Sequence, residues 1–256
     1  MIHALRAPIR LVGNVVIRYW PILAIIALWW WRVSSTGITS IVAPSPGAVL
    51  GDIVMNLPIY IPPLGLTFGL AIIGLACGVC VGVIIGTLVW MSPLVAGLLT
   101  PGAVILRVVP MTALIPIVAR IFGYSGSTVL LIVVLMVFFP AFVLTISGLS
   151  ATPAGTSDVF KVLGSARWNA IWRLHLPSAL PSIMLALRIS APLSVGAVLL
   201  AQYLTAAGGL GALMRQAHNF SLFQREWGVA ILATALSILI FGVARLAEDG
   251  VRRRFN

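Results

Sequence analysis

Charged side chains are scarce in this sequence of 256 residues: they make up 8% of it, and only five are acidic. A soluble domain of this length typically carries about 25% charged residues. Hydrophobic residues reach 61%, and the remaining polar residues could not cover the outside of so apolar a chain in water. The composition excludes an ordinary soluble globular protein and predicts an integral membrane protein.

Cysteine is also rare, since Cys77 and Cys80 are the only two and both lie in one apolar run. Their spacing is shared with redox and metal motifs. There is no second cysteine pair, and His3, His175 and His218 are far apart in the sequence. We interpret the two thiols as facing a packed neighbouring helix, and we expect no metal site and no cofactor.

Lysine occurs once, at Lys161, and no glycine-rich loop ends in Gly-Lys-Ser or Gly-Lys-Thr. A P-loop needs such a loop to hold nucleotide phosphates. Serine and threonine are abundant, but no base stands at the spacing that activates a nucleophile. The chain is therefore not predicted to be an enzyme, and any ATP must be hydrolysed by a separate polypeptide.

The most prominent feature of the sequence is its long runs of apolar residues. A bilayer core of ~30 Å needs about 20 apolar residues in a helix, so the sequence predicts an all-α, polytopic membrane protein with about six transmembrane helices. The proline-rich segment Ile41–Pro63 is expected to be an irregular outer connection. The predicted spans are Trp20–Thr36, Leu66–Trp90, Val95–Ile115, Thr128–Ser147, Ala179–Tyr203 and Trp227–Leu246.

The formal net charge of +11 raises nucleic acid as a partner. The basic residues are scattered between apolar spans, however, which is typical of topology signals rather than of a nucleic-acid surface. With six spans and both termini in the cytoplasm, ten basic residues are cytoplasmic and four are outside. The cytoplasmic set is Arg6, Arg10, Arg18, Lys161, Arg167, Arg173, Arg245, Arg252, Arg253 and Arg254, and the outer set is Arg32, Arg120, Arg215 and Arg225.

Two arginines, Arg107 and Arg188, fall inside predicted spans. Charges there usually face the bundle interior or a cavity. Two interpretations stay open: the arginines attract an anionic solute along a translocation path, or each reaches an interface or bonds a neighbouring helix end. None of the five acidic residues is in the middle of a span, which argues against an ion-coupled secondary transporter, the alternative function.

Glycine recurs every four residues on the second predicted span, at Gly74, Gly78, Gly82 and Gly86. This spacing places the four glycines on one helix face, where another helix backbone can approach closely. The contact is interpreted either as static tight packing or as a surface that slides during transport.

The longest polar stretch, at about 152–177, lies on the predicted cytoplasmic side. It is typical of a short amphipathic helix, a turn at Gly164, a second helix and a proline stop. Val159, Phe160, Val162 and Leu163 give the first helix an apolar face. Such a face in water needs a partner, which predicts docking to another subunit. A left-handed backbone is expected at Gly164, because only glycine adopts it cheaply.

This stretch resembles the cytoplasmic signature of ABC-importer permeases: E-A-A, three residues, G, nine residues, I, one residue, L-P. Asp158 stands at the acidic position, while Val159 and Phe160 depart from the two alanines. Further similarity to the nitrate, sulfonate and taurine branch is carried by short motifs elsewhere. The remaining signature positions are Gly164, Leu174 and Leu176-Pro177. The motifs of the branch are Ala43-Pro44-Ser45-Pro46, Pro110, Pro116, Phe122-Gly123, Phe138-Phe139-Pro140 and Gly209-Leu210-Gly211.

The resemblance implies a single permease domain over 1–256, in the bacterial inner membrane. It implies two ATPase subunits, a second permease that we expect to be an identical copy, and an outer substrate-binding protein delivering a small solute. A sulfonate, nitrate or other small organic anion is the implied solute class, and related permeases that carry uncharged pyrimidine-like compounds leave a neutral solute as the alternative. The segment around Asp158 to Gly164 would be the coupling helix. An acidic residue often precedes the Gly-Leu-Gly motif in this branch, and Gln202 takes its place here, as a candidate for the translocation path.

Overall fold

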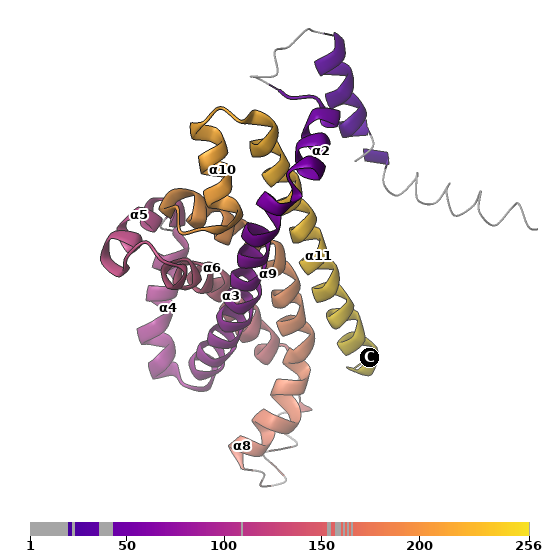
Figure 1. Cartoon of the computed structure of the whole chain (residues 1–256). Coiled ribbons are helices and arrows are strands. Elements are labelled where there is room, and N and C mark those ends of the chain that lie inside the picture. Colours follow the sequence, from indigo (N-terminus) through magenta and orange to yellow (C-terminus); the bar gives the residue numbers. More distant parts are fainter. Residues whose placement is uncertain are drawn as a thin grey trace, which may run out of the picture. The chain divides into compact units, whose positions relative to one another are not determined.

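The computed structural model describes residues 20–21, 24–35, 43–108, 110–152, 155–156, 160, 162, 164 and 166–255. Helices account for all regular structure in these residues, which confirms the all-α prediction (Figure 1). The chain divides into two compact units. The smaller unit comprises Met1–Leu57 and Ala217–Gly228, and the larger unit comprises Pro58–Gln216 and Val229–Asn256. A single functional domain over 1–256 stays a prediction.

Four helices in the described residues are long and apolar enough to cross a membrane. Four of the six predicted spans lie inside them, so these predictions are confirmed in position and in type. They are α3 (Leu57–Met91), α6 (Gly126–Ser150), α9 (Leu176–Thr205) and α11 (Phe223–Phe255).

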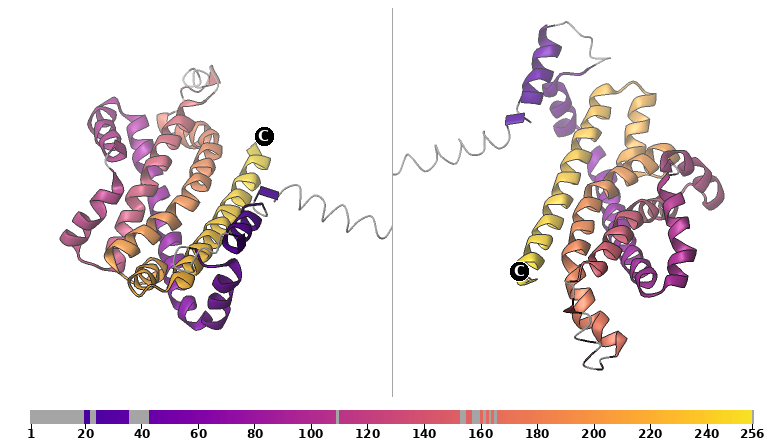
Figure 2. Two further views of the ribbon diagram at one scale, coloured as in Figure 1. Left: turned by 90° about the horizontal axis from the view of Figure 1, so that it is seen from above. Right: turned by 180° about the vertical axis from the view of Figure 1, so that it is seen from behind.

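The core of the larger unit collects small and β-branched side chains from several helices. Val133 and Val137 of α6, Val195 and Val198 of α9, and Ile240 of α11 are all buried in one cluster. The two views of Figure 2 show α11 running alongside α9 in this unit. Polar side chains are few in this interior, and several of them, including Gln202 and Glu248, bond to other helices.

The glycine stripe of α3 packs directly on α6. A methyl group placed on Gly78 would lie 2.6 Å from Cβ of Val137, and one on Gly82 would lie 2.8 Å from the carbonyl oxygen of Phe138. Both distances are shorter than carbon atoms tolerate, so only glycine fits at these two positions. The prediction that another helix approaches this face closely is confirmed.

The two cysteines were expected to face a packed neighbour, and this expectation is wrong. Cys77 and Cys80 are free thiols on the exposed side of α3. The glycines explain the difference, because Gly74 and Gly78 occupy the buried face of the same helix turns.

The third predicted span, Val95–Ile115, is wrong as one continuous helix. The chain forms two shorter helices there, α4 (Pro93–Val108) and α5 (Met111–Phe122). Pro110 precedes α5 with φ −61° and ψ 107°, an extended conformation. Proline lacks the N–H that an uninterrupted helix needs and disfavours the helical conformation of the residue before it, so the helix ends and begins again.

The proline-rich segment Ile41–Pro63 is also not the irregular connection that its composition predicted. It contains α2 (Pro46–Met55) and the first turns of α3. Ser45 caps α2, since its Oγ accepts a 3.2 Å hydrogen bond from the Ala48 N–H. Pro46 opens that helix, where a proline loses no hydrogen bond. Pro46 therefore starts a helix in this segment, and Pro62 and Pro63 lie inside α3.

The smaller unit holds α2 and the helical residues 24–35. The predicted span Trp20–Thr36 falls here, and part of it lies outside the described residues. The Trp29 and Trp227 rings stack with centroids 5.0 Å apart. Arg225 Nη2 lies 3.4 Å from Asp52 Oδ1. An aromatic stack and an ion pair thus join segments that are distant in the sequence.

Candidate functional site

The segment predicted to dock a partner is described in part. Asp158 and Val159 lie outside the described residues. Gly164 has φ +63°, in the left-handed region that was expected at this turn. Phe160 is half-buried, while Val162 is 87% exposed. An exposed valine beside a sharp turn leaves apolar surface available to a partner.

The second predicted helix begins as α8 (Arg167–Ala170) and does not stop at proline. A π-helical turn over Ile171–His175 follows and leads directly into α9. In this turn the Leu176 N–H donates to the Ile171 carbonyl, five residues back. Pro177 then stands inside one continuous helix, two residues after the end of the π-helical turn. The predicted proline stop is wrong because the wider turn absorbs the irregularity.

Leu174, Leu176 and Pro177, the last positions of the signature, are half-buried around this junction. The Ser178 hydroxyl donates a 2.7 Å hydrogen bond to the Leu174 carbonyl. Side chain and backbone together keep the carbonyls of the turn paired, so the signature positions sit in a defined helix rather than in a loop.

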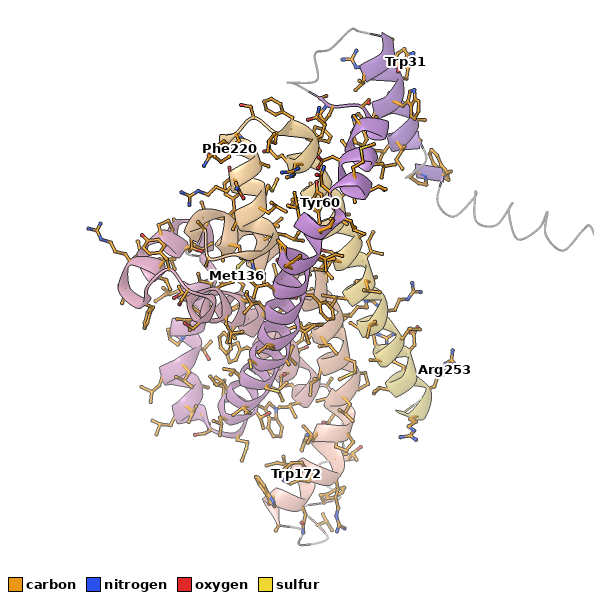
Figure 3. All side chains as sticks on the ribbon, in the orientation of Figure 1. Trp31, Tyr60, Met136, Trp172, Phe220 and Arg253 are labelled. Atoms are coloured by element: carbon orange, nitrogen blue, oxygen red, sulfur yellow. The ribbon has the colours of Figure 1, made fainter. Side chains whose placement is uncertain are left out.

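Sequence analysis missed an aromatic pair on this helix. Trp168 and Trp172 are both more than half exposed, and their rings meet edge to face at 5.7 Å. Figure 3 shows Trp172 at the end of the larger unit where α8 lies. Their spacing of four residues on a short helix was the signal that could have found them.

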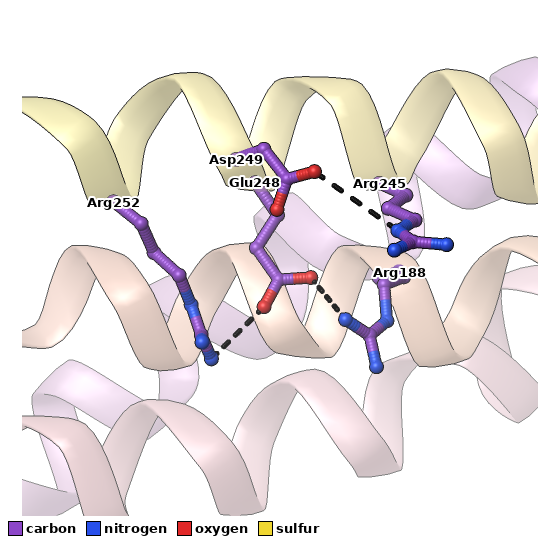
Figure 4. Close-up of polar contacts among 5 residues, drawn as sticks. All are labelled: Arg188, Arg245, Glu248, Asp249 and Arg252. Carbon is purple, nitrogen blue, oxygen red and sulfur yellow. Dashed lines mark hydrogen bonds and ion pairs between the residues drawn. The ribbon is translucent and has the colours of Figure 1, made fainter.

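Arg188, a candidate for the translocation path, forms an ion pair inside the larger unit (Figure 4). Its Nη1 lies 2.8 Å from Glu248 Oε2, and Arg252 Nη2 lies 3.0 Å from the other carboxylate oxygen. The Glu248 side chain is only 1% exposed, against 34% for Arg188. The guanidinium of Arg188 also lies over the Phe241 ring at 5.8 Å. The arginine thus bonds a neighbouring helix, which is one of the two interpretations of its position.

Gln202 is fully buried in a polar network that joins three helices. Its Oε1 accepts hydrogen bonds from Thr67 Oγ1 at 2.8 Å and from the Gly211 N–H at 3.2 Å. The Leu210 N–H donates to Thr67 Oγ1 at 2.9 Å. These two N–H groups open α10 (Gly209–Asn219), so Thr67 of α3 and Gln202 of α9 cap that helix from outside it.

Glycine is required where α10 meets this network. Gly209 has φ +77°, and a side chain there would collide with the Gln202 amide. The preceding Ala206 and Gly208 also have positive φ values, of 54° and 80°. The chain therefore turns sharply enough after α9 to bring Leu210 and Gly211 back onto it.

Two of the three candidates for the translocation path, Arg188 and Gln202, lie in separate polar clusters. Arg188 and Gln202 are separated by about 21 Å along α9, at 1.5 Å per residue. Arg107 is the penultimate residue of α4, and its side chain lies outside the described residues. One polar cluster thus joins α9 to α11, and another joins α9 to α3 and α10.

Comparison with known proteins places these features in context. The family model described as "Binding-protein-dependent transport system inner membrane component" matches residues 78–256. The chain is 31% identical over 188 residues to the formylaminopyrimidine transport permease protein ThiX of Halalkalibacterium halodurans, covering 73% of this chain and 75% of that protein. It is 26% identical over 229 residues to the putative aliphatic sulfonates transport permease protein SsuC of Bacillus subtilis, covering 88% and 83%.

The fold is shared with a solved transporter. The chain superposes on a chain of the MetNI methionine ABC transporter in an inward-facing conformation, with a TM-score of 0.63 and 19% sequence identity. The similarity covers 75% of this chain and 94% of that chain. This similarity shows that the two chains share the fold of the helical bundle.

Proposed function

Because the chain belongs to the family of binding-protein-dependent transport system inner membrane components, we propose that it forms the translocation path of an ABC importer for a small solute. A substrate-binding protein would deliver the solute, and separate ATPase subunits would drive transport. The observation that carries the proposal is the family match over residues 78–256. This stretch includes Gly164 in its left-handed turn and the helical Leu176-Pro177 junction.

The ATPase is proposed to dock on the segment at about 152–177. Asp158, Val159, Phe160 and Gly164 would form the contact, supported by the exposed Val162 and by the turn at Gly164. Leu174, Leu176 and Pro177 would connect this contact to α9, because they lie in the π-helical turn and the first turn of that helix.

The proposed assembly has two ATPase subunits and a second, identical permease. Closed two-fold symmetry is the commonest arrangement of oligomers, and one chain offers one docking segment for each ATPase. Both termini are proposed to be cytoplasmic, in the inner membrane of a bacterium, on the asymmetry of ten basic residues against four across the predicted spans. Lipid would surround the apolar exterior, with the basic end of α11 near anionic headgroups.

A sulfonate or another small organic anion is the proposed solute class. The support is the similarity to a protein named for aliphatic sulfonate transport. Arg188 contributes little to this choice, because its guanidinium is already paired with the buried Glu248 carboxylate at 2.8 Å. Arg107 is therefore the remaining arginine proposed to favour an anion, at the end of α4 where a cation is compatible with the helix dipole.

Co-expression of the chain with its cognate ATPase and binding protein tests the proposal. Solute uptake into proteoliposomes should require all three components and ATP, and the purified chain alone should hydrolyse no ATP. Uptake driven by an ion gradient without the ATPase would instead establish an ion-coupled secondary transporter.

A variant pair tests the docking segment itself. Gly164→Trp forces a bulky residue into a left-handed turn, and we expect it to lose both ATPase co-purification and uptake. Gly47→Trp is the control, because Gly47 is an exposed glycine of α2 with no atom near its missing side chain. Normal co-purification and uptake with Gly164→Trp would remove the docking role.

A further inference from the structure

His175 is a buried titratable residue with no part in the docking contact proposed above. It closes the π-helical turn and has only 9% of its surface exposed. Its Nδ1 shares a 2.9 Å hydrogen bond with Thr152 Oγ1, 23 residues earlier. These two residues stand near the two ends of the docking segment at about 152–177. The hydrogen bond therefore joins the ends of the segment to each other.

A second contact ties the same ring to another helix. The Trp90 and His175 rings lie with centroids 4.5 Å apart and planes tilted by 55°. Trp90 is the penultimate residue of α3. Thr152 also donates from Oγ1 to the Leu149 carbonyl at 3.3 Å, which holds it against the end of α6. The ring of His175 thus touches the end of α3 and is linked to the end of α6 through Thr152.

Close packing surrounds these polar and aromatic contacts. Leu149 of α6 and Ala179 of α9 are fully buried in one cluster, with Trp90 and Leu176 packed against it. A methyl group on Gly148 would lie 3.1 Å from the Ala179 Cα. The ends of α3, α6 and α9 are therefore held together at the place where the docking segment leaves and rejoins the bundle.

The π-helical turn keeps His175 on the buried face of its helix. Ile171, His175, Ala179 and Ile183 are all buried at intervals of four residues, so the packed stripe of α9 continues back through the turn. Trp172 and Arg173 lie exposed between them. One helix end thus presents its exposed side to a partner and its buried side to the bundle.

We infer that His175 is a positioning residue that fixes both ends of the docking segment to α3, α6 and α9. Movement imposed on the segment by an ATPase then reaches three spans together instead of α9 alone. The inference rests on the proposed function, because it assigns a role in energy coupling.

Two variants remove the contacts of His175 separately. His175→Phe keeps an aromatic ring against Trp90 but loses the hydrogen bond, and Thr152→Val removes the same hydrogen bond from the other side. A net hydrogen bond changes an equilibrium by about 2- to 10-fold. Each variant should lower solute uptake per ATP hydrolysed by about that factor. The double variant should be no worse than either single one, because both remove one interaction.

His175→Ala removes the ring as well and should lower the ratio further, while ATPase co-purification stays at the wild-type level. Thr234→Val is the matched control, since Thr234 is exposed and its Oγ1 donates to the Ala230 carbonyl of its own helix. The control should leave the ratio unchanged. The ratio separates positioning from folding, because a purely structural residue would lower uptake and ATP hydrolysis equally.

An unchanged ratio in His175→Ala or Thr152→Val, with a wild-type complex that couples, overturns the inference alone. A wild-type chain that neither retains the ATPase nor shows ATP-dependent uptake overturns the proposed function instead. Additive losses in the double variant would also contradict the inference, because the two residues would then act independently.

Discussion

Arg188 Nη1 donates a 2.8 Å hydrogen bond to Oε2 of Glu248, a residue 60 positions later in the chain. The bond joins α9 to α11 (Figure 4). Burying a carboxylate costs free energy unless a cation compensates its charge, and Arg188 and Arg252 both do so. The pair holds the last turns of α11 against the bundle in spite of the three exposed arginines at positions 252–254.

Glu248→Gln keeps the shape of this side chain and removes its charge. We expect a loss of about 1–3 kcal/mol in the free energy of unfolding, between the values for exposed and buried ion pairs. Thermal unfolding of the purified protein in detergent measures it. Arg245→Ala is the control, because Arg245 and Asp249 are half-exposed at 4.0 Å and such pairs contribute under about 1 kcal/mol. Equal losses in the two variants would contradict the role of Glu248.

Two glycines of α3 provide a matched test of the contact with α6. Gly82→Ala places a methyl group 2.8 Å from the Phe138 carbonyl oxygen, and overpacking of this kind typically costs about 1–3 kcal/mol. Gly69→Ala lies in open space on the same helix and should gain up to about 1 kcal/mol from helix propensity. Unfolding temperatures that fall for Gly82→Ala and rise for Gly69→Ala would agree with this packing. Unfolding temperatures that change in the same direction in both variants would contradict it.

Thr67→Val should release the beginning of α10. The change removes the hydroxyl that accepts from the Leu210 N–H and donates to Gln202. Buried partners left unpaired typically cost about 1–3 kcal/mol each. Hydrogen exchange should accelerate at the Leu210 and Gly211 amides and stay slow in the middle of α9.

Gln202→Leu should accelerate exchange at Gly211 more than at Leu210, since Thr67 still caps the latter. This ordering distinguishes the two capping side chains. Identical exchange patterns in the Thr67 and Gln202 variants would show that the network opens as one unit. They would contradict the assignment of a separate capping side chain to each amide.

Fusion reporters test the proposed orientation. The asymmetry of basic residues predicts that a reporter at the C-terminus is active only in the cytoplasm. A reporter inserted after Asn56, which ends α2, should be active only outside. Activity of the C-terminal reporter outside the membrane would show that the count of six spans is wrong.

Local patterns in the sequence predicted the local features of the structure. The long apolar runs marked α3, α6, α9 and α11, the glycine spacing marked the face of α3 that meets α6, and Gly164 marked a left-handed turn. Each of these depends on residues close together in the chain. Helix periodicity, small side chains and positive φ are all decided within a few residues.

The features that sequence analysis missed depend on distant residues or on proline in a helical context. The partner of Arg188 is 60 positions away, and Thr67 and Gln202 are 135 positions apart, so no local pattern could pair them. Prolines were predicted to mark loops at Ile41–Pro63 and a stop at Pro177. Pro46 instead opens α2, where a proline loses little hydrogen bonding. Pro62, Pro63 and Pro177 stand inside continuous helices.

The separation of α4 from α5 at Pro110 limits what can surround this part of the chain. Helices of 16 and 12 residues are about 24 and 18 Å long, so neither alone crosses a hydrocarbon layer of ~30 Å. If the pair lies in the bilayer as its apolar sequence predicts, the junction lies at membrane depth. Acyl chains offer no hydrogen-bond partner to the backbone groups freed there. Protein or water, not lipid, must therefore contact the Pro110 junction in the assembled transporter.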